Sequence, residues 1–214
     1  MATIVPTILC ETEDDYKATI ERLHPFAQRV HIDLTDGEFA PTFTVGVNQI
    51  WWPQEWTVDI HAMVARPSQY VDALVQMKPA TVIFHAETSE DLTPIIAKLK
   101  QAGIKAGVAL LKPTVPSTVQ PYIESADHVL VFSGDLGHYG GTASLMQLEK
   151  VRLIRTIHPE VEVGWDGGAN TENAFSLAQG GVDVINCGGA INKAGDPAGA
   201  YKQLVDEINK HAVI

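Results

Sequence analysis

The sequence predicts a single-domain (β/α)8 barrel, because eight short apolar runs alternate with helical stretches along its length. No Ser-rich or Gly-rich linker and no block of charge divides the chain, so residues 1–214 are expected to form one domain. Eight βα units match this fold, near its lower size limit. A doubly wound parallel sheet is the alternative that the same alternation permits.

The elements follow in order along the chain. The β-like runs are Thr3–Leu9, Arg29–Asp33, Thr57–Met63, Thr81–His85, Lys105–Leu110, His128–Phe132, Glu160–Gly164 and Asp183–Asn186. The helical stretches are Glu13–Leu23, Pro67–Met77, Glu90–Ala102, Ser144–Ile157, Thr171–Gln179 and Pro197–His211, with weaker signals at Asn48–Trp52 and Ser117–Tyr122. Several helix starts have suitable residues: Thr12, Ser89 and Asn170 can cap, and Pro67 and Pro197 suit first turns.

The composition excludes several classes of protein. A net charge of −11 argues against a broad nucleic-acid surface, which needs clustered Lys and Arg. The sequence contains no run of 18 apolar residues, so no membrane span is indicated. Cys10 and Cys187 are too few for a disulfide scaffold, and the first residues lack the basic start of a signal peptide, so a cytoplasmic location is expected. Because the chain is acidic, an anionic ligand would need a local binding site, such as backbone N–H groups in a glycine-rich segment.

Histidines and aspartates gather where the predicted strands end, which is where barrel enzymes carry their chemistry. His31 and Asp33 are two apart on one strand and so point to the same side, and His61 ends the next strand. Asp166 follows a later strand, which faces the second across the mouth of a closed barrel. Together these four side chains predict a divalent metal site, with Zn²⁺ expected and Fe²⁺, Mn²⁺ or Co²⁺ as alternatives. Each histidine alone would more simply be a hydrogen-bonded core residue.

Two of these residues also suggest a reaction. Opposed carboxylates of Asp33 and Asp166 can remove a proton from one face of a carbon and return one to the other face. A metal on the adjacent carbonyl oxygen would stabilise the enediolate between these steps. The pattern predicts epimerisation next to a carbonyl, although Asp166 by itself could be a turn residue before the glycines that follow it.

Three glycine pairs follow the last three predicted strands. Backbone N–H groups in such pairs can approach an anion closely, and the loops after strands seven and eight are the usual phosphate site of this fold. A single pair is most often only a turn, but three at successive strand ends favour a phosphate cradle. The pairs are Gly140–Gly141, Gly167–Gly168 and Gly188–Gly189.

Longer motifs run through nearly the whole chain. They include His31-Ile32-Asp33-Leu34-Thr35-Asp36-Gly37-Glu38-Phe39, Asp59-Ile60-His61-Ala62-Met63-Val64, Phe84-His85-Ala86-Glu87, Trp165-Asp166-Gly167-Gly168 and Asn186-Cys187-Gly188-Gly189-Ala190. On these motifs the chain resembles the ribulose-phosphate 3-epimerase family. The resemblance implies that His31, Asp33, His61 and Asp166 hold the metal and that Asp33 and Asp166 are the catalytic acid/base pair.

The resemblance also implies the substrate and its contacts. D-ribulose 5-phosphate would be converted to D-xylulose 5-phosphate with inversion at C3. Thr7 stands where the family usually has a serine near the substrate, Met63 matches a methionine that lines the cavity, and His85 lies near the site without being a ligand. With the six glycines of the three pairs, these are the predicted substrate-binding residues.

The chain departs from the family in the segment 132–142, which would cover the substrate. The usual Met-Thr-Val-Asn-Pro-Gly-Phe-Gly-Gly-Gln is replaced by a sequence one residue longer, beginning at Phe132 and ending at Thr142. Thr35 replaces another methionine, and Gly189 stands where a serine is usual at the phosphate. The chain is therefore interpreted as a divergent member, with another phosphorylated ketose, such as a ketohexose 6-phosphate, as an alternative substrate.

Two further interpretations remain. A lyase or decarboxylase of the same superfamily would carry Asp-x-Lys-x-x-Asp, but residues 31–36 contain no lysine. A non-catalytic barrel that binds phosphate or metal is the second. A homo-oligomer is expected, and Trp51, Trp52 and Trp56 favour packing beneath a loop over a subunit contact.

Overall fold

Eight parallel strands close into a barrel in the computed structural model, which describes residues 2–210. Neighbours in sequence are neighbours in the barrel, and β1 closes the ring by pairing with β8. The strands are β1 (Thr3–Ile8), β2 (Arg29–Thr35), β3 (Thr57–Met63), β4 (Thr81–His85), β5 (Lys105–Leu110), β6 (His128–Phe132), β7 (Glu162–Asp166) and β8 (Val184–Cys187). The predicted (β/α)8 barrel is confirmed, and the doubly wound sheet is wrong.

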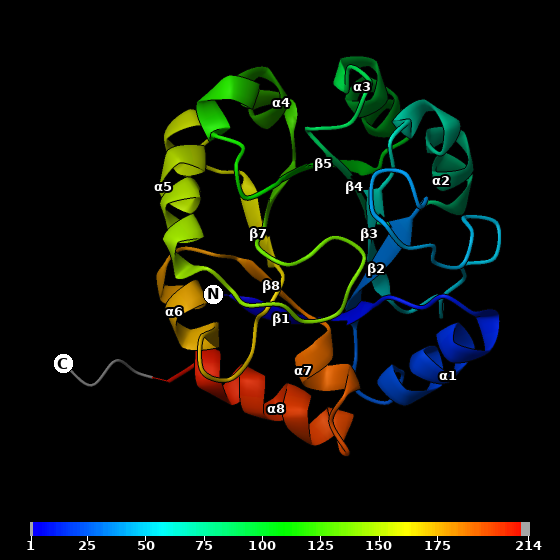
Figure 1. Cartoon of the computed structure of the whole chain (residues 1–214), viewed down its shortest axis with the longest axis vertical. Coiled ribbons are helices and arrows are strands. Elements are labelled where there is room, and N and C mark those ends of the chain that lie inside the picture. Colours follow the sequence, from blue (N-terminus) through cyan, green and yellow to red (C-terminus); the bar gives the residue numbers. More distant parts are fainter. Residues whose placement is uncertain (1, 211–214) are drawn as a thin grey trace.

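Helices surround the barrel as an outer layer (Figure 1). They are α1 (Glu13–Leu23), α2 (Val71–Met77), α3 (Thr93–Gln101), α4 (Gln120–Ser125), α5 (Leu148–Ile157), α6 (Ala174–Gln179), α7 (Gly189–Asn192) and α8 (Pro197–Ile208). Short 3₁₀ turns at Pro67–Gln69, Pro116–Val119 and Leu145–Gln147 precede α2, α4 and α5. The main core lies between strands and helices, and a smaller group, Ile83, Ala109 and Leu130, fills the barrel interior.

Element ends differ from the prediction at several points. Thr12 caps α1 by accepting a hydrogen bond from the Asp15 N–H at 3.2 Å, but Ser89 and Asn170 cap no helix, because α3 and α6 begin later. Residues 48–52 form neither helix nor strand. Helix α8 ends at Ile208, and its predicted end at His211 lies outside the described residues.

Strand β7 begins two residues later than predicted, and this shift bears on the site. The chain turns after α5, where the Val161 N–H donates to the His158 carbonyl at 3.4 Å, so the strand begins only at Glu162. Asp166 is consequently the last residue of β7, paired with Phe132 of β6. The backbone of Asp166 is thus part of the strand that forms the barrel wall and does not belong to the following loop.

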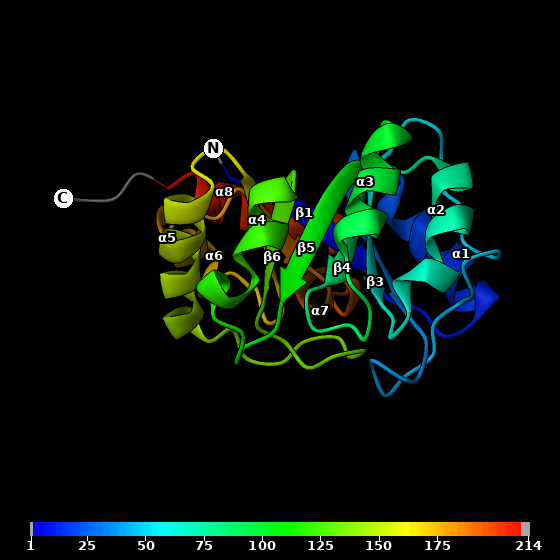
Figure 2. The same ribbon diagram turned by 90° about the horizontal axis from the view of Figure 1, so that it is seen from above.

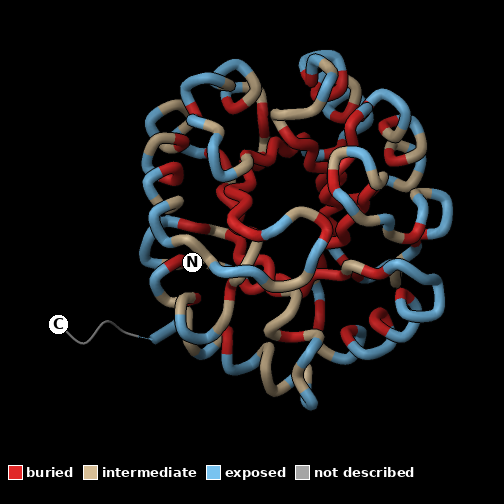
Figure 3. The backbone as a smooth tube through the Cα atoms, in the orientation of Figure 1, coloured by how far each residue is buried: buried red, intermediate tan, exposed pale blue. Residues whose placement is uncertain are grey.

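The loops that follow the strands gather at one end of the barrel. Figure 2 shows β5 pointing toward this end, where the loops after β2 and β6 also lie. The loop after β6, residues 133–144, crosses the mouth of the barrel in Figure 1, and we call it the lid loop. Figure 3 shows this partly exposed segment in front of the buried ring of strands.

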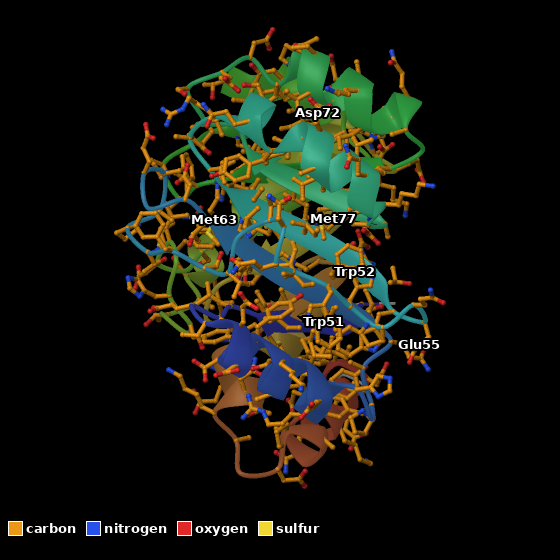
Figure 4. The ribbon with its side chains drawn as sticks, turned by 90° about the vertical axis from the view of Figure 1, so that its right-hand side faces the viewer. Trp51, Trp52, Glu55, Met63, Asp72 and Met77 are labelled. Atoms are coloured by element: carbon orange, nitrogen blue, oxygen red, sulfur yellow. The ribbon has the colours of Figure 1, made fainter. Side chains whose placement is uncertain are left out.

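The three tryptophans after β2 are distributed between core and surface. Trp56 is buried and Trp52 packs against the core, which agrees with packing beneath a loop. Trp51 is 47% exposed, its ring lies edge-on to Tyr16, and the Tyr16 hydroxyl donates to the Trp51 carbonyl at 2.7 Å. Figure 4 shows Trp51 and Trp52 on this side of the molecule, between α1 and α2.

An ion-paired cluster occupies the opposite end of the barrel from the loops. Arg29 bonds Asp59 at 2.6 Å and Glu162 at 2.8 Å, and the His128 ring lies 2.8 Å from Glu162. Burial alone raises the pKa of Glu162, but the hydrogen bonds with Arg29 and His128 lower it well below its usual range. The cluster therefore stabilises the fold while Glu162 is ionised.

Replacing Glu162 by glutamine is expected to lower the free energy of unfolding by about 2 kcal/mol at pH 7. Because the pKa of Glu162 is lowered on folding, its contribution is complete above its unfolded value of about 4.3 and is lost as pH falls below it. Urea unfolding at pH 7 and pH 3 measures both effects. The exposed Glu160→Gln is the matched control, and an equal loss at both pH values would contradict the assignment.

Candidate active site

Four side chains from three strands converge at the mouth of the barrel. His31 and Asp33 come from β2, His61 from β3 and Asp166 from β7. One ligand atom from each lies within 4.8 Å of the others, and all four residues are buried. The fold therefore brings together the cluster that the sequence predicted.

The distances within the cluster suit ligands arranged around one point. Asp33 Oδ1 lies 3.2 Å from His31 Nε2 and 3.0 Å from His61 Nδ1. Asp166 Oδ2 lies 3.8 Å from His31 Nε2 and 3.5 Å from His61 Nδ1. Each carboxylate thus faces both imidazoles.

The electrostatics of the cluster favour ionised carboxylate. Burial alone raises the pKa of Asp33, but the neighbouring imidazoles of His31 and His61 lower it to about 2. Burial lowers the pKa of His61, yet Asp166 and Asp33 raise it to about 9. The cluster therefore attracts positive charge, either a proton or a metal ion.

The donor set fits a divalent cation. Both ring nitrogens of His31 are buried and have no hydrogen-bond partner among the described residues. A buried polar atom without a partner costs about 1–3 kcal/mol, so a ligand for His31 is expected. Two imidazole nitrogens and two carboxylate oxygens are typical of Zn²⁺ and also suit Fe²⁺, Mn²⁺ and Co²⁺.

His85 lies behind His61 rather than on the cavity wall, where the sequence placed a substrate-binding residue. Its Nε2 is 2.9 Å from His61 Nε2, and its Nδ1 is 3.4 Å from Glu87 Oε2. Glu87 in turn accepts hydrogen bonds from the Leu111 N–H and the Thr114 hydroxyl. A chain of polar groups thus runs from the cluster to a carboxylate behind it.

Aromatic rings surround this chain. Phe39 and Phe132 lie 4.8 and 5.6 Å from the His85 ring, measured between centroids. Burial lowers the pKa of His85 to about 4, only partly opposed by Glu87. The His85 imidazole is therefore neutral at physiological pH, with one nitrogen able to accept a hydrogen bond from His61.

A cavity of about 220 Å³ lies over the cluster and extends to the glycine pairs. Asp33 and Asp166 lie in its wall, together with the predicted Thr7 and Met63. All six predicted glycines line it as well: Gly140, Gly141, Gly167, Gly168, Gly188 and Gly189. The predicted substrate-binding residues, except His85, therefore face one cavity.

Glycine is required where the loops meet. Gly167 has a φ of +103°, and a Cβ there would lie 2.0 Å from the backbone nitrogen of Gly134 in the lid loop. A Cβ on Gly188 would lie 2.5 Å from the ring of Tyr139. The glycines after β7 and β8 thus let the lid loop approach them closely, as a cradle for a small anion requires.

Tyr139 fastens the lid loop to the first strand. Its hydroxyl accepts a hydrogen bond from the Leu9 N–H at 2.6 Å and donates to the Thr7 carbonyl at 3.3 Å. The Thr42 hydroxyl donates to the Gly137 carbonyl at 3.1 Å, so the loop after β2 also holds the lid. The altered segment is thus an ordered cover over the cavity.

Sequence reasoning missed several residues of the cavity wall. Tyr139 and Asn186 line the cavity, and Lys193 is the one Lys or Arg side chain that lines it among the described residues. Lys193 comes directly after α7, whose first residue is Gly189. A lysine four positions after a glycine pair was a signal that could have indicated a cationic group beside a phosphate.

A barrel with a histidine–aspartate cluster beneath a glycine-lined cavity defines a class of enzyme that handles small phosphorylated molecules. The model of the "Ribulose-phosphate 3 epimerase family" matches residues 3–192. The chain belongs to this family, whose named members are isomerases, as the sequence predicted.

Curated relatives agree over nearly the full length. Ribulose-phosphate 3-epimerase of Schizosaccharomyces pombe is 27% identical over 216 residues, covering 98% of this chain and 95% of that protein. The cytoplasmic isoform of Oryza sativa is 30% identical over 211 residues, covering 95% and 92%. Among solved structures, 3-hexulose-6-phosphate synthase of Salmonella typhimurium has a TM-score of 0.73 at 18% identity, covering 96% and 97%. That likeness concerns the fold alone.

Proposed function

We propose that the protein interconverts D-ribulose 5-phosphate and D-xylulose 5-phosphate. The observation that carries this proposal is that Asp33 of β2 and Asp166 of β7 lie beside His31 and His61 and line the same cavity as the three glycine pairs. Membership of the family supports the same reaction. A divalent ion in this cluster, when bound, would polarise the substrate carbonyl and stabilise the negative charge of the enediolate.

The protein's own residues divide the work. One aspartate removes the C3 proton, and the other returns a proton to the opposite face, so the configuration at C3 inverts. Met63 and Phe132 line the cavity with apolar surface, which excludes water from the reacting carbon. The backbone N–H groups of the glycine pairs bind the phosphate, and the lid loop covers it.

The first experiment supplies purified protein with Zn²⁺, Mn²⁺, Fe²⁺ or Co²⁺ and follows ribulose 5-phosphate by NMR in D2O. Formation of xylulose 5-phosphate with deuterium at C3 is expected. Turnover only of a ketohexose 6-phosphate would favour the alternative substrate that the altered lid loop suggests. Bound metal without turnover of any phosphorylated ketose would favour the non-catalytic barrel and overturn the proposal.

Lys193 is expected to strengthen binding of the phosphate dianion. In a chain with net charge −11, a cation in the wall of the cavity offsets repulsion of an anionic substrate. Replacing it by methionine should raise KM about 10-fold with little change in kcat, and the difference should shrink in high salt. Steady-state kinetics at two salt concentrations check this. Lys202→Met on α8 is the matched control, and an unchanged KM would contradict the role.

We also propose a cytoplasmic location for the enzyme. The two cysteines, Cys10 and Cys187, are unpaired and buried, consistent with the proposed cytoplasmic location. None of the helices in residues 2–210 has the length and apolar character needed to cross a membrane. A homo-oligomer is also proposed, and sedimentation of the purified protein tests it.

A further inference from the structure

Asn186 is a buried amide that the proposed reaction does not yet use. It is 1% exposed, and neither its Oδ1 nor its Nδ2 has a hydrogen-bond partner among residues 2–210. It belongs to the wall of the cavity that contains Asp33 and Asp166. Leaving both ends of a buried amide unpaired costs about 1–3 kcal/mol per group, so the fold gains nothing from this side chain.

Asn186 lies along the cavity between Asp166 and the glycine pair that follows β8. In the β7–β8 register its Cα partner is Asp166, the proposed acid/base group. Two residues further along its own chain is Gly188, the first glycine of the pair that follows β8. A ligand that reaches from Asp166 to these glycines therefore passes over Asn186.

The chemistry of the side chain indicates what it recognises there. A carboxamide offers one acceptor and two donor hydrogens, and an alcohol is both donor and acceptor. Thr7, whose hydroxyl also has no partner among the described residues, pairs in register with His31 and lies near Gly188, where a Cβ would be 3.6 Å from the Thr7 Cβ. Asn186 is the polar residue that pairs in register with Asp166.

We propose that Asn186 determines specificity by binding the hydroxyl group on the carbon between the reacting carbon and the phosphate-bearing carbon of a ketose phosphate. This inference rests on the proposed function, because it takes Asp166 and the glycine pairs as the two ends of the bound substrate. In ribulose 5-phosphate the group is the C4 hydroxyl. Its O–H donates to Asn186 Oδ1, or its oxygen accepts from Asn186 Nδ2.

The experiment compares two enzymes on two substrates. The enzymes are the wild type and Asn186→Leu, which has a similar volume and no polar atom. The substrates are ribulose 5-phosphate and its 4-deoxy analogue. In the wild type, removing the hydroxyl should lower kcat/KM about 10- to 100-fold, the range expected when a buried polar group is left unpaired. In Asn186→Leu the two substrates should differ by less than about 3-fold.

The melting temperature provides a second measurement, because a structural role for Asn186 would make the variant less stable than the wild type. Because the leucine removes an unpaired buried amide, the melting temperature of Asn186→Leu should equal or exceed that of the wild type. A fall of several degrees would show that Asn186 supports the fold and would count against the proposal. The control Asn209→Leu, at the exposed end of α8, should leave substrate discrimination unchanged.

The outcomes separate the two proposals. An active wild type that does not discriminate the 4-deoxy analogue overturns the role of Asn186 and leaves the epimerase function standing. This comparison needs no variant, so it holds even if Asn186→Leu fails to fold. A wild type that is inactive on every phosphorylated ketose overturns the proposed function and this inference with it.

Discussion

Replacing Asp33 or Asp166 by asparagine is expected to lower kcat about 10³-fold or more. Asparagine keeps the shape of the side chain but can neither accept nor return the C3 proton, and such groups contribute about 10²–10⁴-fold to catalysis. Each substitution also removes a charged ligand from the cluster, which weakens any bound cation. Steady-state kinetics and metal titration measure the two effects separately.

Deuterium exchange distinguishes the two aspartates. If each carboxylate serves one face of C3, a variant lacking one of them should exchange the C3 proton of only one epimer with D2O. The matched control is Asp72→Asn, which is on the outer helix α2 (Figure 4). Asp72 forms an ion pair with Lys98. Loss of exchange from both epimers at full metal loading would contradict the division between Asp33 and Asp166.

Replacing His85 by leucine is expected to weaken metal binding about 10- to 100-fold, the usual effect of removing a partner of a ligating histidine. When Nδ1 of His61 holds a metal, the ring proton is on Nε2, which lies 2.9 Å from the accepting Nε2 of His85. Without that acceptor, His61 can move its proton to Nδ1 or turn its ring. Competition titration with a chromogenic chelator measures the affinity without relying on turnover.

Two further variants show whether His85 acts through this hydrogen bond. His85→Gln offers an oxygen acceptor near the position of Nε2 and should recover part of the affinity. Glu87→Gln should lower affinity less than His85→Leu, because it leaves the His85 acceptor beside His61 in place. Glu90→Gln, at a half-buried glutamate that bonds Ser68, is the control, and equal affinities in all variants would refute a positioning role for His85.

The fold was predictable because the same sequence pattern, an apolar strand followed by a helix, repeats along the chain. Eight buried strands separated by helices define a parallel closed sheet, and six of the eight predicted strands match the observed ones within a residue at either end. The start of β7 was wrong because apolar Val161 belongs to the turn that follows α5. Asp166 looked like a turn residue because it precedes two glycines, yet it pairs with both neighbouring strands.

The site was predictable where it follows from strand register. His31 and Asp33 share a face because they are two apart, and β3 aligns His61 directly with Asp33. Strand register does not show whether a side chain lines the cavity or lies behind its wall. The sequence therefore predicted that His85 contacts the substrate, although it does not line the cavity. Lys193 and Asn186 were missed because each is a single polar residue near a glycine pair, and only the packed lid loop shows that they face the cavity.

The attachment of Tyr139 to the first strand has a consequence for the order of folding. Its hydroxyl bonds join residues 130 and 132 positions apart, and Asn192 reaches the Thr7 carbonyl over 185 positions. Contacts of such sequence separation form late, because a long loop must close first. The cover of the cavity can be completed only after β8 has joined β1, so refolding chains should acquire native helix content before they acquire affinity for a phosphorylated ligand.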